Sequence, residues 1–330
     1  MDVKHVQHFR FKVNAMQFLS GQTNIDFMGK RKLAIIFSGL LLLISIGSLV
    51  TQGLNFGIDF TGGTMIEVAY EQTADLEQIR TSLKSNGYDA IVQNFGSIHE
   101  VLIRLPVIES ANMAELSTDV LAILQADSPS ELDVRRIEFV GPQVGEELTE
   151  QGGLAMLYAL FGILIYVSFR FEYRFAIGSV AALVHDVLIT LGVFSVFQFE
   201  FDLTVLAAIL AIIGYSLNDT IVVFDRIRET FLRQRKGSPE EIVNRALNDT
   251  LSRTLMTSLT TLLVVISLFI FGGEVIHAFS IALILGIVVG TYSSVYIASN
   301  VLLSMGVSKV DLMPVQKEDN DDIGEDGSQV

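Results

Sequence analysis

Six long apolar stretches constrain this chain more than any other feature of its sequence. The first, Leu33–Val50, contains 18 residues without a charge and follows three consecutive basic residues, Lys30–Lys32. A stretch of this length can cross a bilayer as a helix, and it is longer than the apolar part of a typical signal peptide. Because no small-residue cleavage pattern follows Val50, we expect an uncleaved first transmembrane helix at 33–50.

Five further stretches of the same character follow residue 150. They are Gly153–Ser168, Ala176–Phe197, Leu203–Phe224, Leu255–Phe271 and Ala278–Met305. The composition is also that of a membrane protein, since 50% of the 330 residues are hydrophobic and 18% are charged. In soluble domains about 25% of the residues are charged. We therefore predict an α-helical membrane protein with six transmembrane helices, five of which form a bundle over 153–305.

The acidic residues are concentrated in two blocks. Residues 51–150 contain 17 acidic and 5 basic residues, and residues 308–330 contain 7 and 2, whereas the rest of the chain is nearly neutral. We expect both blocks to lie in water, the first as a folded domain and the second within a disordered acidic tail at 306–330. The absence of a basic face argues against binding to nucleic acid.

The distribution of lysine and arginine predicts the orientation in the membrane. Basic residues gather in the segments that the six-helix topology places on one side, namely 1–32, 170–174 and 226–253, and the turns around Glu200 and Glu274 contain none. Since basic loops stay in the cytoplasm, we expect a cytoplasmic N-terminal segment at 1–32, both termini in the cytoplasm, and 51–150 outside.

Residues 51–150 show the alternation of a small α+β domain. Strand-like runs at 64–70, 91–95, 101–105 and 132–140 alternate with amphipathic runs at 74–86 and 113–124. The order strand, helix, strand, strand, helix, strand predicts a ferredoxin-like periplasmic domain between the first and second transmembrane helices. This fold hosts many functions and identifies none of them.

Asp219 is the clearest candidate for function, because an ionisable side chain inside a transmembrane helix is costly. It lies deep in the fourth helix beside Asn218, and Gly214 and Tyr215 precede these two by four residues, so we expect a polar flank that faces other helices. One interpretation is a carboxylate that joins helices by hydrogen bonds. We favour the other, a site for an ion or a proton.

Arg253, at the start of the fifth helix, is the candidate partner of Asp219. It lies in a stripe of hydroxyl residues that includes Thr257. The alternative is an arginine that reaches from the membrane boundary into water. If the two form a pair, burial favours the neutral acid and a nearby arginine favours the ionised form, so a helix movement that changes their separation would bind or release a proton.

The remaining polar and small residues of the spans receive lesser roles. We expect Asp186, in the third helix, to be an accessory polar contact, with a second ion or proton carrier as the alternative, and its neighbour His185 to be a packed histidine. Gly286 and Gly290 are spaced by four and predict a helix-packing face. The tract Pro239–Asp249 predicts an interfacial amphipathic helix, and the charged residues at 225–229 a solvated cluster.

The sequence contains no constellation typical of an enzyme. Without cysteine, a thiol nucleophile, a disulfide or a cysteine-based metal centre is excluded, and the five histidines lack metal-ligand spacing. Gly62-Gly63 is followed by Thr64, with no lysine to reach a phosphate. We therefore expect no enzyme activity, no cofactor and no metal, and energy supplied by an ion gradient or a partner.

Several segments together resemble a known family. They are Leu54–Thr64, Phe139–Gly145, Ser216–Thr220, Phe224–Glu229 and Asn248–Thr254. Each resembles a signature of the SecF branch of the SecD/SecF family of bacterial protein-export membrane proteins, within the resistance-nodulation-division superfamily. The resemblance spans residues 30–305, and only the termini lie outside it.

The resemblance implies a multi-pass protein of the bacterial inner membrane that works with SecD beside the SecYEG translocon, often with YajC. Such an assembly would use the proton motive force to pull or release preproteins after the SecA ATPase has acted. Asp219 and Arg253 fall on the family's transmembrane aspartate and arginine implicated in proton transport, with Asn218, Asp186 and Thr257 as accessory candidates.

The resemblance also bears on the glycine-rich segment after the first helix. There we interpret Gly57, Asp59, Gly62 and Gly63 as structural, since glycines permit a tight backbone where the helix meets the domain.

Two other functions stay open at this point. Six helices and one outer domain resemble half of a superfamily transporter built from two parallel repeats, so a complementary partner is implied. The chain could then be half of a proton-coupled exporter of small molecules or lipids, or a passive scaffold for the translocon. An outer domain of about 90 residues is small for a drug-binding domain, which favours the protein-export motor. Whether the coupling ion is a proton or sodium is open.

Overall fold

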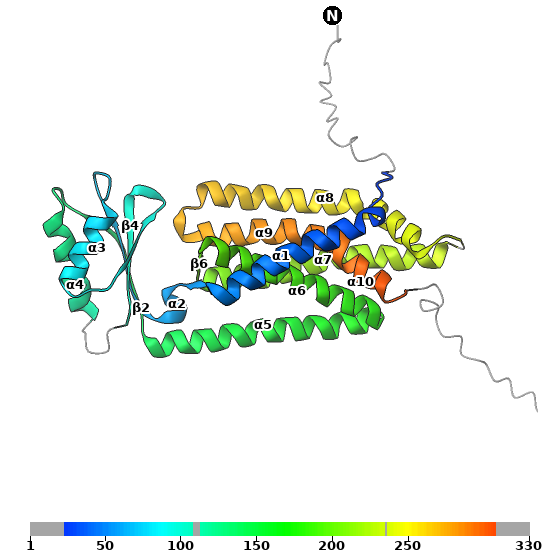
Figure 1. The fold of residues 1–330 in the computed structure, drawn as a ribbon, viewed down its shortest axis with the longest axis horizontal. Helices are drawn as coiled ribbons and strands as arrows, with labels where there is room; N and C mark the ends of the chain where they lie inside the picture. The colour runs from blue at the N-terminus through cyan, green and yellow to red at the C-terminus, as the bar shows by residue number, and fades with distance from the viewer. Residues whose placement is uncertain (1–22, 108–112, 235, 308–330) are drawn as a thin grey trace, which may run out of the picture.

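The computed structural model describes residues 23–107, 113–234 and 236–307, and consists of a helical bundle with a small α/β domain at one end (Figure 1). We call the end of the bundle nearest this domain the domain end, and the opposite one the far end. Six helices of the described residues are long and apolar enough to cross a membrane. The predicted six spans are thereby confirmed.

The first five spans are single helices. They are α1 (Arg31–Thr51, preceded by the 3-10 turn η2, Met28–Lys30), α5 (Pro142–Arg170), α6 (Tyr173–Phe197), α7 (Leu203–Arg233) and α8 (Pro239–Phe271). The sixth is composite, with a 3-10 turn η3 (Glu274–Ile276), α9 (His277–Ser293), a π-helical turn η4 (Ser294–Ala298) and α10 (Ser299–Ser304).

The six spans differ in how much of each lies inside the bundle. In α6 and α7, 56% of the most apolar window is buried, against 17% in α1 and α8 and 11% in α5. The outer faces of α1, α5 and α8 are apolar, with side chains such as Leu43, Phe161 and Val264 more than half exposed. α6 and α7 are therefore the centre of the bundle, and the other three present apolar surface outward.

Two helices start earlier than the apolar pattern predicts. α8 begins at Pro239, where Ser238 and Glu241 form a reciprocal cap, and continues without glycine or a further proline to Phe271. The prediction of a separate interfacial helix over 239–249 is therefore wrong. Residues 239–249 are the first turns of α8, because no helix-breaking residue separates them from the fifth span. Similarly, α5 begins at Pro142, inside the range 51–150 assigned to the domain.

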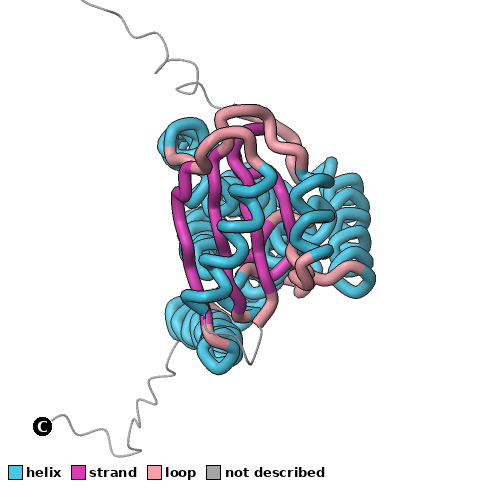
Figure 2. Tube along the Cα trace, turned by 90° about the vertical axis from the view of Figure 1, so that its left-hand side faces the viewer, coloured by secondary structure: helices cyan, strands magenta, loops and turns pink. Residues whose placement is uncertain are grey.

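The domain has the predicted order of elements. They are β2 (Gly63–Ala69), α3 (Leu76–Ser85), β3 (Ile91–Phe95), β4 (Ser97–Leu105), α4 (Met113–Asp127) and β5 (Asp133–Val140). The strands pair antiparallel in the order β3-β4-β2-β5. Figure 2, viewed from the domain end, shows α3 and α4 in front of the sheet and the bundle behind it. The ferredoxin-like topology is confirmed.

The core of the domain lies between the sheet and its two helices. Apolar residues of alternating strand positions and of the inner helix faces are buried there, including Ile66, Val68, Leu83, Val101 and Val120. The opposite face of the sheet carries Met65 and Leu102, which pack with Ile58 near the bundle. The sheet therefore packs on its helices and also faces the bundle.

The chain joins and leaves the domain through adjacent strands. β2 follows Gly62 and β5 precedes Pro142, and the two strands pair with Gly63 opposite Val140. A Cβ on Gly62 would lie 3.1 Å from the Cα of Pro142, so the two connections lie side by side. Before β2, β1 (Asn55–Phe56) pairs in parallel with β6 (Glu200–Phe201), and the short helix α2 (Ile58–Thr61) follows.

Candidate functional site

Asp219 lies inside the bundle on α7 with 2% of its surface exposed. Its Oδ2 accepts a hydrogen bond from Ser258 Oγ of α8 at 3.5 Å, and Ser258 Oγ lies 2.7 Å from Thr291 Oγ1 of α9. A distance of 3.5 Å is at the long limit of a hydrogen bond. The carboxylate is therefore buried among three helices with one weak polar contact among the described residues.

Arg253 does not contact Asp219. Its side chain is exposed on α8, and none of the ion pairs within 4.0 Å in the described part of the chain includes it. The hydroxyl of Thr257 donates to the backbone oxygens of Arg253 at 3.1 Å and Thr254 at 2.9 Å. Of these α8 residues, Ser258 hydrogen-bonds to Asp219, whereas Arg253 acts on Asp219 through space without contacting it, and Thr257 bonds only to the backbone of its own helix.

Asn218 also lies apart from Asp219. It is exposed, as is Gly214, whereas Asp219 is buried and Tyr215 half-buried. Successive residues of a helix differ by about 100° in direction, so neighbours in sequence need not share a face. The predicted inward polar flank is correct for Asp219 and wrong for Asn218.

Asp186 occupies a second polar site at the centre of the bundle, with 1% of its surface exposed. Its Oδ1 lies 2.9 Å from His185 Nδ1 on α6. Its Oδ2 accepts hydrogen bonds from Ser216 of α7 at 2.5 Å and Ser293 of α9 at 2.7 Å. This carboxylate joins three helices through three short contacts, a greater role than an accessory contact suggests.

His185 extends this site toward α1. The residue is 3% exposed, and its ring stacks against Tyr292 of α9 with centroids 6.2 Å apart. The Tyr292 hydroxyl donates to the Ala34 backbone oxygen at 2.9 Å and lies 3.0 Å from Ser38 Oγ, both on α1. The imidazole therefore lies between the Asp186 carboxylate and a polar contact with the first span.

The close approach of α9 to α7 depends on Gly286 and Gly290. A Cβ on Gly286 would lie 2.2 Å from the side chain of Ile212, and one on Gly290 would lie 3.0 Å from Ser216 Cβ. The predicted small-residue face is in contact with α7, next to the serine that binds Asp186. The spacing of four residues is the signal that identified it.

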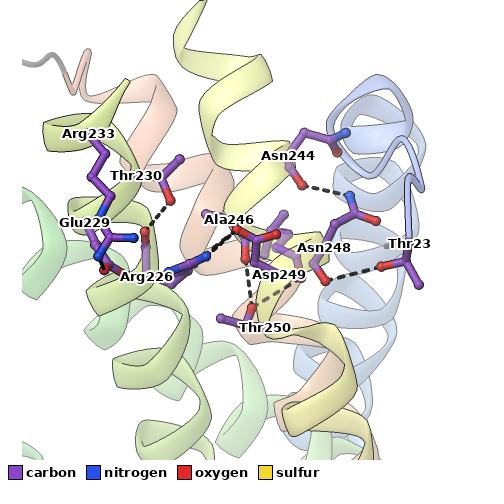
Figure 3. Close-up of polar contacts among 11 residues, drawn as sticks. Thr23, Arg226, Glu229, Thr230, Arg233, Asn244, Ala246, Asn248, Asp249 and Thr250 are labelled. Atoms are coloured by element: carbon purple, nitrogen blue, oxygen red, sulfur yellow. Dashed lines mark hydrogen bonds and ion pairs between the residues drawn. The ribbon is translucent and has the colours of Figure 1, made fainter. Parts of the chain in front are cut away.

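The far end of the bundle carries an ion-pair cluster (Figure 3). Arg226 of α7 pairs with Asp249 of α8 at 2.7 Å and with Glu229 at 2.6 Å, and Arg233 pairs with Glu229 at 2.7 Å. The sequence predicted a solvated cluster at 225–229. The partner on α8 was missed, since no local pattern connects residues 226 and 249.

Beside this cluster, α8 holds the chain that leads into α1. The Asn248 side-chain amide bonds both backbone groups of Ile25 at 2.8 Å, and Asn244 Oδ1 accepts from Phe27 N at 2.8 Å. The carbonyl oxygen of Asn248 also accepts from Thr23 Oγ1 at 3.2 Å, as Figure 3 shows. Both asparagines were missed, because each acts on residues more than 200 positions away.

At the domain end, Asp59 binds the first turn of α7. Its Oδ2 accepts a hydrogen bond from the Leu203 backbone N–H at 3.0 Å, while Asp202 caps Val205 N at 2.8 Å. The first backbone N–H groups of a helix have no partner within it, so a carboxylate from another segment can fill this role. Asp59 thus ties the segment before the domain to the helix that carries Asp219.

The glycines around Asp59 permit close contacts. Gly62 and Gly63 have φ of +69° and +130°, and a Cβ on Gly63 would lie 2.4 Å from the Leu105 backbone oxygen. A Cβ on Gly57 would lie 3.0 Å from Glu200 Oε1. This geometry accounts for the structural role inferred for this segment.

An ion pair that the sequence did not reveal joins the domain to the bundle. Arg104 Nη1 of β4 lies 3.4 Å from Glu200 Oε1 of β6, and the arginine is 6% exposed. Burial raises the pKa of the Glu200 carboxyl, and Arg104 acts in the opposite direction. A cavity of about 440 Å³ lies beside the pair, between sheet and bundle.

Comparison with known proteins assigns the chain to a family. Residues 120–308 match "Protein export membrane protein SecD/SecF, C-terminal", and residues 47–74 match the "SecD/SecF GG Motif". The chain belongs to the SecD/SecF family. The first match contains α5 to α10 with Asp186 and Asp219, and the second contains Asp59 with its glycines. All five segments that carry the resemblance lie within these two matches.

Curated relatives cover nearly the whole chain. It is 54% identical over 303 residues to a protein translocase subunit SecF of Vibrio alginolyticus, covering 92% of this chain and 96% of that one. It is 51% identical over 299 residues to a SecF of Pseudomonas aeruginosa, covering 90% and 97%. The chain is therefore a multi-pass membrane protein of the protein-translocation type.

Solved SecDF structures have the same fold. The translocon-associated SecDF of Thermus thermophilus matches with a TM-score of 0.78 and 37% identity. A SecDF described as being in a super-membrane-facing form matches with a TM-score of 0.65 and 38% identity. Each match covers 86% of this chain and 39% of the solved one. This SecD/SecF chain therefore spans about two fifths of those SecDF chains.

Proposed function

We propose that this chain is a SecF-type subunit that assembles with a SecD-type subunit and uses the proton motive force to promote preprotein translocation. The observation that carries the proposal is Asp219, a carboxylate inside a membrane span whose hydrogen bond, at 3.5 Å, is long. A buried carboxylate with so little stabilisation changes its protonation state more readily than one held by several donors.

The proposed partner follows from what the chain lacks relative to SecDF. It covers 39% of the solved SecDF chains at 37% identity, and a SecD-type subunit would supply the remainder. The apolar outward faces of α1, α5 and α8 are surfaces on which such a subunit, or lipid, would pack. The proposed site of action is the SecYEG channel in the bacterial inner membrane, with YajC associated and SecA acting earlier on the preprotein.

In this mechanism Asp219 takes up and releases the proton, and Arg253 is the cation that favours release. Arg253 is exposed on α8, five residues from Ser258, the donor to Asp219. A rotation or shift of α8 would carry Arg253 toward Asp219 and favour the ionised carboxylate. One proton crossing the membrane delivers about 2.3 kcal/mol per 100 mV.

The chain also offers a route by which this step would move the domain. α7 carries Asp219, and its first turn is bound by Asp59 in the segment that leads into β2. SecDF chains of equal coverage and nearly equal identity match with TM-scores of 0.78 and 0.65, which favours more than one arrangement in this family. We therefore propose that proton transfer shifts the domain on the periplasmic side, where it would act on the emerging preprotein and promote its release.

The proposed orientation places the domain in the periplasm and both termini in the cytoplasm. The far end of the bundle carries the basic residues Arg31, Lys32, Arg170, Arg174 and Arg226. Basic residues remain in the cytoplasm, which supports the far end as the cytoplasmic one.

The test is preprotein translocation into vesicles that contain the chain, its SecD-type subunit and the translocon. Asp219→Asn should abolish the stimulation by an imposed proton gradient and leave the gradient-independent rate. Asp225→Asn is the matched control, since Asp225 lies on the same helix, is 61% exposed and pairs with Arg170. Full stimulation in Asp219→Asn would overturn the motor function in favour of a passive scaffold.

A second arm of the same experiment identifies the coupling ion. Collapse of the proton gradient alone should remove the stimulation, whereas collapse of a sodium gradient alone should leave it. The reverse result would show that sodium is the coupling ion, and the proposed proton coupling would then be wrong.

A further inference from the structure

The His185–Asp186 pair lies inside the bundle, and the mechanism above gives it no role. Both oxygens of the Asp186 carboxylate are occupied, Oδ1 by His185 Nδ1 and Oδ2 by the hydroxyls of Ser216 and Ser293. An ionised carboxylate only accepts hydrogen bonds, and three donors are the surroundings that stabilise its charge. The hydrogen between the two residues therefore resides on Nδ1.

This tautomer leaves His185 Nε2 as a free lone pair. The nitrogen is buried and has no hydrogen-bond partner among the described residues, in a side chain that is 97% buried. Buried polar atoms are nearly always paired, because an unpaired one costs free energy. Packing alone does not require an unpaired ring nitrogen at this position. Proton uptake does require one, because the proton binds to the free lone pair of Nε2.

The surroundings suit a proton at that nitrogen. Protonation would convert a neutral imidazole beside a carboxylate into an imidazolium–carboxylate pair, so the net charge of the buried site would change from −1 to 0. The ring stacks on Tyr292 with an interplanar angle of 28°, and an aromatic face attracts a cation. Imidazole is also the side chain that ordinarily changes charge between about pH 5 and 8.

The helices packed against α6 bring no cation to the middle of the bundle among the described residues. The charged residues of α1, Arg31 and Lys32, lie in its first turn, and α10 has no ionisable side chain. The other basic groups on these neighbours are Arg170 of α5 and Arg226, Arg228 and Arg233 of α7 at the far end, and His277 of α9 at the domain end. The remaining ionisable groups are Glu146, Glu147, Glu150, Tyr158 and Tyr166 of α5, Tyr215, Asp219, Asp225 and Glu229 of α7, Tyr292 of α9 and Tyr296 of η4.

The pair is connected to Asp219 by two helices. On α7, Ser216 binds Asp186 and lies one turn before Asp219. On α9, Ser293 binds Asp186, and Thr291, two residues earlier, lies 2.7 Å from Ser258, the donor to Asp219. A change in either site that moves α7 or α9 therefore alters the hydrogen bonds of the other.

We propose that the His185–Asp186 pair is a second proton-binding site inside the membrane, with His185 Nε2 as the atom that takes the proton, coupled to Asp219 through α7 and α9. This inference deepens the proposed function and rests on it only for the coupling to translocation. The reaction is a proton transfer to a lone pair, and no bond other than N–H forms.

The direct test follows the imidazole itself. A full-length variant in which the other four histidines are replaced by glutamine leaves His185 as the only histidine. With ¹⁵N-labelled histidine in lipid vesicles, its nuclear magnetic resonance signals should show the neutral form with hydrogen on Nδ1 at high pH. They should convert to the doubly protonated form as the pH falls from 8 to 5. A neutral form that persists throughout would overturn the proposal.

The coupling is tested by adding Asp219→Asn to this single-histidine chain. The pH at which His185 converts should change, because coupling between two binding sites is reciprocal. An unchanged conversion would refute the coupling. This measurement does not depend on translocation, so it distinguishes failure of the second site from failure of Asp219 as the proton carrier.

A functional test uses His185→Asn, whose amide can still donate to Asp186, in the translocation assay with the complete assembly. The stimulation by a proton gradient should fall at least tenfold, while His277→Asn, the same change at the domain end of α9, should leave it unchanged. Equal stimulation in the two variants would overturn a role for His185. Recovery of each variant in the assembled complex controls for folding.

Discussion

The two buried carboxylates of the bundle lie on different helices, Asp186 on α6 and Asp219 on α7, and their surroundings differ greatly. Asp186 has contacts of 2.5, 2.7 and 2.9 Å from three different helices. Asp219 has one contact, at 3.5 Å, to a serine that is itself bound at 2.7 Å to Thr291. Both are almost fully buried, at 1% and 2% exposure.

Burial alone therefore does not determine what a membrane carboxylate does. A charge with three donors is stabilised where it is, and it holds the helices that supply those donors in one arrangement. A charge with one long contact holds its surroundings weakly, and its environment can change at little cost. We interpret Asp186 as the fixed member of the two and Asp219 as the one whose environment changes.

The largest predicted effect is the loss of the Asp186 carboxylate. Asp186→Ala leaves His185 Nδ1 and the Ser216 hydroxyl without their acceptor and removes the shorter of the two hydrogen bonds of Ser293. It should lower the free energy of unfolding by about 3–5 kcal/mol, since each buried donor left unpaired costs about 1–3 kcal/mol. Asp219→Ala should lower it by about 1 kcal/mol or less, since it removes one weak contact. Equilibrium unfolding in detergent micelles measures both values. Equal losses of stability in the two variants would contradict the proposed difference between the Asp186 and Asp219 sites.

Removal of a single donor to Asp186 should have the next largest effect. Ser293→Ala deletes the 2.7 Å hydrogen bond to a charged oxygen and should cost about 1.5–3 kcal/mol. Ser267→Ala is the control, because that exposed hydroxyl donates to the backbone of its own helix at 2.9 Å. The same unfolding assay should show a change below about 0.5 kcal/mol for the control, and similar losses in both would contradict the assignment.

The glycine contact between α9 and α7 offers a smaller perturbation of the Asp186 site. Gly290→Ala would press a methyl group against Ser216 at 3.0 Å and should cost about 1–2 kcal/mol. Gly214→Ala, where nothing lies within 4 Å, should be neutral or stabilise the helix by up to about 1 kcal/mol. Thermal unfolding of the two variants compares them, and a destabilised Gly214→Ala would show that the free space is used by a partner.

The smallest predicted effect concerns Glu200, a carboxylate outside the spans, which contrasts with the two buried aspartates because its contribution to stability depends on pH. Burial raises its pKa above that of the unfolded chain, so the folded protein binds this proton more tightly. Its contribution to stability is therefore present at low pH and is lost as the pH rises through the folded-state pKa. The pH dependence of unfolding should weaken in Glu200→Gln and persist in Glu71→Gln, a change of an exposed residue.

Much of the architecture could be predicted because it depends on local patterns. Apolar runs long enough to cross a bilayer identify the spans, and periodicity identifies the domain strands and helices. The two buried aspartates stood out for the same reason, since a charged side chain within an apolar run is visible without knowledge of the fold. Gly286 and Gly290 were visible through their spacing.

What the sequence did not reveal depends on partners far apart in the chain. The pairing of Arg104 with Glu200, and of Arg226 with Asp249, requires the helices to be placed relative to one another. The contrast between Ser258, which contacts Asp219, and Arg253, which is exposed, depends on the rotation of α8 about its axis. Hydrophobic periodicity is weak in a helix that is apolar on nearly all sides, so that rotation could not be predicted.

The adjacent connections of the α/β domain have a consequence for how such proteins can be altered. Because β2 and β5 leave the bundle side by side, at Gly62 and Pro142, the segment between them is a cassette whose ends already meet. A short linker could replace the whole cassette without displacing α1 or α5, and a different domain with adjacent termini could be inserted in its place. Evolution could have exchanged the outer domain of this architecture while the six-helix membrane unit stayed intact.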